Sequence, residues 1–268
     1  MKKLFILPII FFFSCAKDNH SSAQNKEDHT TLLKTNDGDI FDLVRSPVSS
    51  NCPEDMVEVE GDYCPQIEEH CNLWLDPTAT NGGEGPVRCA EFAPSKCLSK
   101  KRKYLNFCID KYEFPNIKGA IPQVYMSWNS AKLSCENEGK RLCQDYEWTF
   151  ACEGEDIKSY PYGDGLHRDA HACNIDNPWI NPWKNSFDKL DQRVPSGSMN
   201  CQSKGIYDLT GNVDEFVVNS SGKPYVSALK GGHNTIGARN RCSVSTISHN
   251  SEFAWYETGT RCCSNINK

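Results

Sequence analysis

The chain has 268 residues, of which 38% are hydrophobic and 10% aromatic, and its formal net charge is −6. This length allows one large domain or two small ones, and this composition excludes wholesale disorder. The acidic balance and the lack of a basic patch interleaved with aromatic residues argue against a nucleic-acid partner.

The first 15 residues have the pattern of an export signal. Lys2 and Lys3 precede an apolar run, residues 4–13, which is too short to span a membrane as a mature helix. Ser14-Cys15 follows at once, so that the order is basic, apolar, small and Cys. The segment resembles a bacterial lipoprotein signal. An ordinary signal peptide and an uncleaved anchor stay open as alternatives.

The lipoprotein resemblance rests on residues 12–15 as the lipobox, with Phe12 where leucine is usual. It implies removal of residues 1–14 and a lipid on Cys15. Residues 15–50 are polar and predict a flexible tether. Ala16 is similar to the residue at that position in outer-membrane lipoproteins. The expected location is the bacterial cell envelope, with a lipid anchor in the outer membrane that faces the periplasm or the exterior.

The chain contains 15 cysteines, and assigning Cys15 to the lipid leaves an even number. No Cys-x-x-Cys occurs, which argues against a zinc ribbon or a thioredoxin-type redox pair. Scattered cysteines in an exported chain are typical of disulfide bonds. We expect residues 51–106 to form a disulfide-rich N-terminal insertion. With Cys108 it holds six cysteines, and their pairing order is open.

Hydrophobic patterns predict a small number of regular elements. Residues 56–59 and 107–112 alternate apolar and polar side chains, as strands do. Ser127 is a credible N-cap for a helix that Gly139 terminates. A second helix is expected over Asp145–Cys152.

The run 204–216 combines turn-forming glycines with clustered side-chain oxygens. It places Asn212, Asp214 and Glu215 directly after Gly211. A strand leading into a tight turn with converging oxygens suits a hard cation such as Ca²⁺. A plain turn with solvated acids is the alternative.

These segments together resemble the formylglycine-generating enzymes, also called sulfatase-modifying factors. The resemblance rests on motifs that occur in the family's order, such as Lys-Arg-Leu, Tyr-Pro-Tyr-Gly, Gly-Ile-Tyr-Asp-Leu-Thr-Gly-Asn-Val, Lys-Gly-Gly and Gly-Thr-Arg-Cys, from Met56 to Cys263. It implies an α+β, C-type-lectin-like sulfatase-modifying-factor domain over residues 51–268, rich in disulfides and irregular structure.

The resemblance also implies two disulfides that join the predicted helices to the C-terminal half, Cys135–Cys262 and Cys152–Cys242. For the additional cysteines we expect Cys143–Cys263 and Cys173–Cys201. A redox-active pair of the neighbouring Cys262 and Cys263 is the alternative.

The family binds calcium in two loops, and one of them coincides with the run 204–216. The matching ligands are Asn212, the carbonyl of Val213 and Glu215. Asp214 replaces the family's usual Trp. A second site is implied at Asn174 and Ile175, with help from Asp188 or Asp191, at altered spacing.

Active members of the family oxidise a sulfatase cysteine to formylglycine with Cu(I), which two cysteines after the Gly-Gly pair bind. Soft thiolates select Cu(I). The corresponding positions here carry Ile236 and Arg241, or Ala238 if a short deletion is allowed. Cys242 aligns better with a structural cysteine, and the sequence therefore argues against copper.

Two further groups have open interpretations. His167 and His171 have the spacing of a metal pair on a helix, but nearby glycines favour a loop with solvated histidines. The aromatic residues Trp179, Trp183, Trp255 and Tyr256 are either core packing or a ligand-facing rim.

Three functions remain open on this basis. The first is a non-catalytic, membrane-tethered module that binds a protein or an envelope polymer, and the absence of the copper cysteines favours it. The second is an oxidoreductase related to formylglycine generation with a different metal site. The third is a structural envelope protein with no specific ligand.

Overall fold

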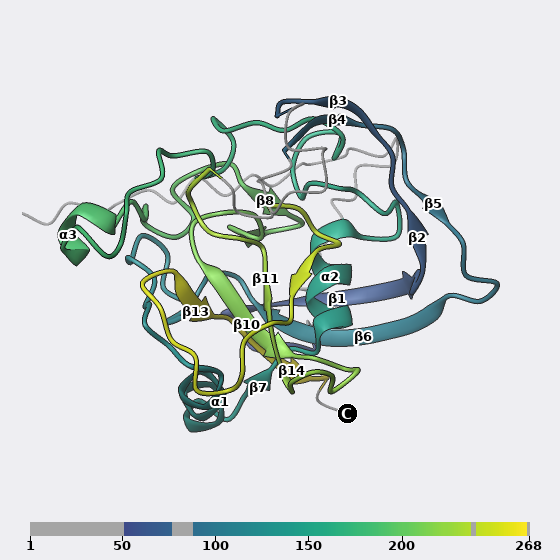
Figure 1. Ribbon diagram of the computed structural model, residues 1–268. Helices are drawn as coiled ribbons and strands as arrows, with labels where there is room; N and C mark the ends of the chain where they lie inside the picture. The colour runs from purple at the N-terminus through teal and green to yellow at the C-terminus, as the bar shows by residue number, and fades with distance from the viewer. Residues whose placement is uncertain (1–50, 77–87, 237–239, 267–268) are drawn as a thin grey trace, which may run out of the picture. The chain divides into compact units, whose positions relative to one another are not determined.

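The computed structural model describes residues 51–76, 88–236 and 240–266 (Figure 1). The predicted signal and tether lie outside the described residues, as does Ala238. Cys15 and its proposed lipid therefore stay a prediction.

The first sheet is antiparallel, with the strands in the order β1 (Met56–Tyr63), β6 (Lys103–Asp110), β14 (Cys262–Asn265) and β7 (Arg141–Leu142). Its longest pair places Met56 opposite Asp110 and Tyr63 opposite Lys103. Both predicted strands are present, but β6 begins earlier than expected and ends at Asp110. Strand β14 lies between β6 and β7, so it is an inner strand that joins these two parts of the sheet.

The second sheet is mixed, with the order β12 (Ser245–Thr246), β11 (Ser227–Lys230), β10 (Asp214–Val218) and β13 (Thr258–Thr260). Strand β10 pairs antiparallel with β11 and parallel with β13, where Asp214 lies opposite Thr258. Successive side chains of a strand point to opposite faces. Glu215 is completely buried, whereas Asp214 is partly exposed.

Two longer helices occupy the predicted positions. In α1 (Trp128–Asn137) the Ser127 hydroxyl accepts a hydrogen bond from the Ser130 backbone N–H, and Gly139 follows the end with φ of +71°. A positive φ there ends the helix without the strain that a side chain would bring. Helix α2 (Asp145–Glu153) comes next, and a short helix, α3 (Phe187–Leu190), follows later. None of the helices in the described ranges has the length and apolar composition to span a bilayer.

The hydrophobic core lies between α2 and the two sheets. Trp148 of α2 packs in one buried cluster with Phe107 and Ile109 of β6 and with Val217 of β10. A second cluster joins Trp128 of α1 to the second sheet and to Cys262. Both helices therefore pack on the C-terminal half of the chain.

Seven disulfides connect the cysteines from Cys52 onward. The described ranges contain both pairs that the family resemblance implies, both further pairs that we expected, and three pairs in the N-terminal part: Cys135–Cys262, Cys152–Cys242, Cys143–Cys263, Cys173–Cys201, Cys52–Cys108, Cys64–Cys97 and Cys71–Cys89. Because Cys262 and Cys263 bond to different partners, they do not form a redox pair with each other.

The short strands sit beside these disulfides as two-stranded pairs. Two pairs lie in the N-terminal part: β2 (Ile67–Glu68) with β5 (Lys96–Cys97), and β3 (Cys71–Trp74) with β4 (Cys89–Phe92). The third pair, β8 (Gln202–Ser203) with β9 (Ile206–Tyr207), comes shortly before β10 in the chain. Such short pairs bury little apolar surface, and the disulfides restrict the unfolded chain in their place.

The disulfides are expected to contribute unequally. Cys135–Cys262 closes 127 residues inside the core, whereas Cys71–Cys89 closes 18 residues and includes the partly exposed Cys71. Loop-closure entropy predicts a loss of about 5 kcal/mol when both Cys135 and Cys262 become Ala, against about 3 kcal/mol for the Cys71 and Cys89 pair. Guanidinium unfolding followed by tryptophan fluorescence measures both, and an equal or reversed order would contradict this ranking.

Candidate functional site

The predicted turn lies between β9 and β10. Asp208, Gly211 and Asn212 all have positive φ, between +59° and +79°. A side chain at position 211 would place its Cβ 2.3 Å from the carbonyl oxygen of Asn174, so only glycine allows this approach. The turn thus packs directly on the Asn174 loop.

A buried ion pair fixes the strand that follows. The guanidinium of Arg261 donates from Nε to Oε2 of Glu215 at 2.7 Å and from Nη2 to Oε1 at 2.6 Å. The indole Nε1 of Trp148 donates to the same Oε2 at 2.5 Å. Both carboxylate oxygens of Glu215 are therefore occupied by donors.

Two more carboxylates lie near this pair. Burial, followed by repulsion from Asp208 and Glu215, raises the pKa of Glu113 well above its ordinary value, and burial raises the pKa of Asp208 to about 6. Ser196 and Asn212 donate to one oxygen of Glu113, while its other oxygen, Oε1, is buried without a partner.

The structure brings the two expected calcium loops together. Oδ1 of Asn212 accepts hydrogen bonds from Nδ2 of Asn174 and from the backbone N–H of Val194, each at 2.9 Å. Oδ1 of Asn174 accepts from Asn177 at 2.7 Å. Ile175 and Val213 are buried core residues.

The side-chain oxygens of Asn212, Asn174 and Glu215 thus face N–H donors, an arrangement that does not fit a cation needing six or more oxygens. Asp191, named as a helper for the second loop, pairs with Arg193 at 2.6 Å. Calcium binding stays a prediction.

The expected copper positions carry no thiol. The side chain of Ile236 is partly exposed, and Arg241 lies over the Phe92 ring, with its Nε 3.6 Å from Glu69. Cys242 is bonded to Cys152. Within the described ranges, every cysteine belongs to a disulfide.

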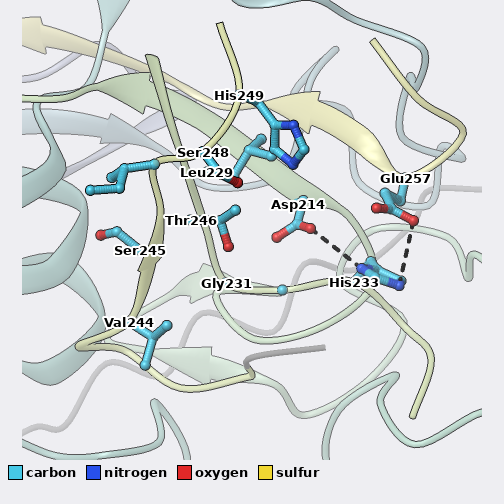
Figure 2. Close-up of a pocket in the computed structure, with 12 residues that line it drawn as sticks. Asp214, Leu229, Gly231, His233, Val244, Ser245, Thr246, Ser248, His249 and Glu257 are labelled. Carbon is cyan, nitrogen blue, oxygen red and sulfur yellow. Dashed lines mark hydrogen bonds and ion pairs between the residues drawn. The ribbon is translucent and has the colours of Figure 1, made fainter. Parts of the chain in front are cut away.

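A pocket of about 350 Å³ opens beside the second sheet (Figure 2). Asp214 comes from the start of β10, His233 follows the Gly-Gly turn after β11, and Glu257 precedes β13. His233 lies between the two acids: its Nδ1 is 3.3 Å from Asp214 Oδ2 and its Nε2 is 3.5 Å from Glu257 Oε2. Figure 2 shows the two carboxylates on different sides of the His233 imidazole, each joined to it by a dashed line.

The two acids determine the charge state of this cluster. Burial opposes a charged imidazole, but the hydrogen bond to Asp214 and the field of Glu257 raise the pKa of His233 above its ordinary value. Burial also raises the pKa of Glu257, although His233 works against this. The three side chains are each less than one-fifth exposed.

The histidines and aromatic residues that the sequence analysis singled out lie outside this pocket. His167 is 59% exposed and pairs with Asp164 at 2.8 Å. Neither it nor His171 lies in a described helix, so the helical spacing of a metal pair is not realised. Trp183 is 78% exposed and lies 6.3 Å, centroid to centroid, from Trp255. Trp179 is also exposed, whereas Tyr256 is buried.

Comparison with known proteins places this fold in a family. The sulfatase-modifying factor enzyme 1-like domain matches residues 78–266, and the chain therefore belongs to this family. The predicted fold class, an α+β sulfatase-modifying-factor domain with many disulfides, is confirmed. The crystal structure of CarF has the same fold at a TM-score of 0.52 and 16% identity, covering 80% of this chain and 99% of CarF.

Two curated relatives are similar over part of their length. The chain is 32% identical over 107 residues to inactive C-alpha-formylglycine-generating enzyme 2 of Bos taurus, covering 37% of this chain and 33% of that protein. It is 29% identical over 104 residues to formylglycine-generating enzyme of Mus musculus, covering 35% of this chain and 26% of that enzyme. The chain thus spans about a third of these relatives or less.

Sequence reasoning identified Asp214 but not its partners. His233 directly follows the Gly-Gly pair, and Asp214 stands where the family has Trp. The replacement of the family's Trp by Asp214 was the available signal. Nothing in the sequence pointed to Glu257, because its position next to Asp214 depends on the parallel pairing of β10 with β13.

The Arg261–Glu215 pair is expected to be critical for stability. Arg261→Met or Glu215→Gln should each cost about 3–5 kcal/mol, because either change leaves the remaining partner buried without its counterpart. Thermal and denaturant unfolding measure the loss. Lys132→Ala is the control, since it breaks an exposed helix pair with Glu136 and should cost about 0.5 kcal/mol or less. Similar losses of stability in all three variants would contradict the critical role of the Arg261–Glu215 pair.

Proposed function

We propose that the protein is a non-catalytic binding module of the sulfatase-modifying-factor family, held at the cell envelope by a lipid on Cys15. The observation that carries the proposal is the chemistry at the copper positions. A guanidinium and a branched alkyl group stand there, and neither is a soft ligand for Cu(I).

The disulfides support the same conclusion. Cu(I) chemistry of this family needs a pair of free thiolates, and Cys242, the nearest cysteine in sequence, is fully buried and bonded to Cys152. A disulfide sulfur carries no thiolate charge with which to hold the metal. A similar protein of Bos taurus is named inactive C-alpha-formylglycine-generating enzyme 2, which supports a non-catalytic role.

Two surface features suit a binding role. One is the pocket beside β10 and β11, and the other is the exposed Trp183 with its neighbour Trp255, which is half-buried. Exposed tryptophans are typical of recognition surfaces because they offer large, rigid contact areas. A protein or an envelope polymer is the class of ligand that we propose.

The alternative is an oxidoreductase with a different metal site. The cluster of Asp214, His233 and Glu257 is the observation that favours it, because these side chains are metal ligands in other enzymes. A purely structural role is the remaining possibility, and it needs neither the pocket nor the aromatic pair.

An activity assay tests the non-catalytic proposal. The protein loaded with Cu(I) and given oxygen, a reductant and a Cys-x-Pro-x-Arg peptide should form no aldehyde, because it lacks the thiolate pair that holds copper. Mass spectrometry detects the aldehyde, and an active formylglycine-generating enzyme is the positive control. Copper-dependent aldehyde formation above the level of free Cu(I) would overturn the proposal.

Membrane tethering is tested at Cys15. In a bacterial host the full chain should appear in the membrane fraction, with an N-terminal peptide that begins at Cys15 and carries the mass of acyl chains. Cys15→Ser should lose this mass, because serine has no thiol to acylate, whereas Ser21→Ala should keep it. An unmodified N-terminal peptide in the wild-type protein would refute the lipid anchor.

A further inference from the structure

The cluster in the pocket has the geometry of a metal site. One ligand atom each from Asp214, His233 and Glu257 lies within 4.8 Å of the other two. The 3.3 Å distance joins Asp214 to Nδ1 of His233 and the 3.5 Å distance joins Glu257 to Nε2, so only one of the two can belong to the ligand atoms of a single ion. Ligand atoms about 2.0–2.2 Å from a shared tetrahedral ion lie roughly 3.3–3.6 Å apart, so side-chain rotation toward one ring nitrogen must draw the three atoms together to enclose one ion.

The charge of the pocket favours a cation. Two carboxylates lie within reach of one imidazole, and no Lys or Arg is among the described residues that line this pocket. The other lining residues are mostly small or neutral, with His249 as the second imidazole. His249 stacks on the Phe253 ring at 3.7 Å and is not part of the cluster.

Hydrogen bonds from the backbone and from neighbouring side chains hold the three proposed ligands in place. The backbone N–H of Asp214 donates to the carbonyl of Glu257 at 2.9 Å, which ties the two acids together. Nδ2 of Asn240 donates to the His233 carbonyl at 2.7 Å. Thr235 Oγ1 lies 2.7 Å from Nε2 of His233 and orients the ring. Ligands fixed by such outer contacts lose little freedom when they bind a metal.

We propose that Asp214, His233 and Glu257 form a binding site for one divalent transition-metal ion of the zinc class. Mixed nitrogen and oxygen ligands suit zinc and its first-row neighbours. Calcium requires more oxygen ligands than this cluster has, and Cu(I) prefers thiolates. Asp214, the acid that β10 contributes, points to the opposite face of that strand from Glu215, the acid of the expected calcium loop.

The ion has an open coordination position toward the pocket. Three protein ligands leave a fourth place for water or for a donor atom of a bound molecule. This step rests on the proposed binding function: an anionic group of the ligand would complete the coordination. Zinc binding itself does not depend on that function.

Metal titration of the untagged full chain in detergent at neutral pH tests the proposal. We expect one Zn²⁺ per chain by calorimetry, with a Kd on the order of 1 µM or tighter. Co²⁺ should give visible absorption bands that added Zn²⁺ removes. Millimolar Ca²⁺ should not compete, because the cluster offers too few oxygens.

Variants assign the ion to this cluster. His233→Ala should weaken zinc binding by about 100-fold or more, and Asp214→Asn and Glu257→Gln, which keep the side-chain shape, by about 10-fold or more. His167→Ala is the matched control, since His167 also lies near two carboxylates but is exposed, and its Kd should stay unchanged. Circular dichroism and melting curves confirm that each variant is folded.

Unchanged zinc binding in His233→Ala and both conservative variants would overturn the site, as would the absence of any heat or cobalt band in the wild-type protein. Loss of binding in His167→Ala alone would also overturn it. None of these three results bears on the copper assay, which tests the proposed non-catalytic function independently.

Discussion

The structure depends most on the buried pair between Arg261 and Glu215. A completely buried guanidinium is costly, and here it is balanced by bidentate hydrogen bonds to Glu215 and by the backbone carbonyls of Asp110 and Tyr207. One side chain thus connects β6, β9 and β10 to the end of β13. Because neighbours in a strand point to opposite faces, fixing Glu215 in the core also directs Asp214 toward the pocket. The buried pair therefore fixes both the central strands and the orientation of Asp214 in the candidate metal cluster.

Much of the fold could be predicted, because its signals are local or follow a known order. Ser127 and Gly139 mark the ends of α1 by capping chemistry, and the family motifs occur in sequence order. The candidate site could be predicted only in part. Asn212 and Glu215 have the same local pattern whether a cation or N–H donors satisfy their oxygens. The donors that satisfy Glu215 come from Trp148 and Arg261, which lie 67 and 46 residues away.

This chain keeps the family's fold and has no cysteine at the expected copper positions. The disulfides, the buried ion pair and the Gly-Gly turn build the same fold without a thiolate pair at the copper positions. At the same turn, His233 faces two acids that neighbouring parallel strands bring together. Ile236 and Arg241 thus stand where copper ligands are expected, and the nitrogen and oxygen ligands of the proposed zinc site lie at the nearby Gly-Gly turn and strand ends.

A count of free thiols tests the central claim most directly, namely that this scaffold carries no copper thiolate pair. The full-length protein, unfolded in guanidinium without a reductant, is treated with a thiol-specific reagent. The account predicts that no cysteine from Cys52 to Cys263 reacts, because all of them are in disulfides, and that only an unlipidated Cys15 would give a signal. Two reactive thiols per chain, mapped to Cys242 and one other cysteine, would contradict it.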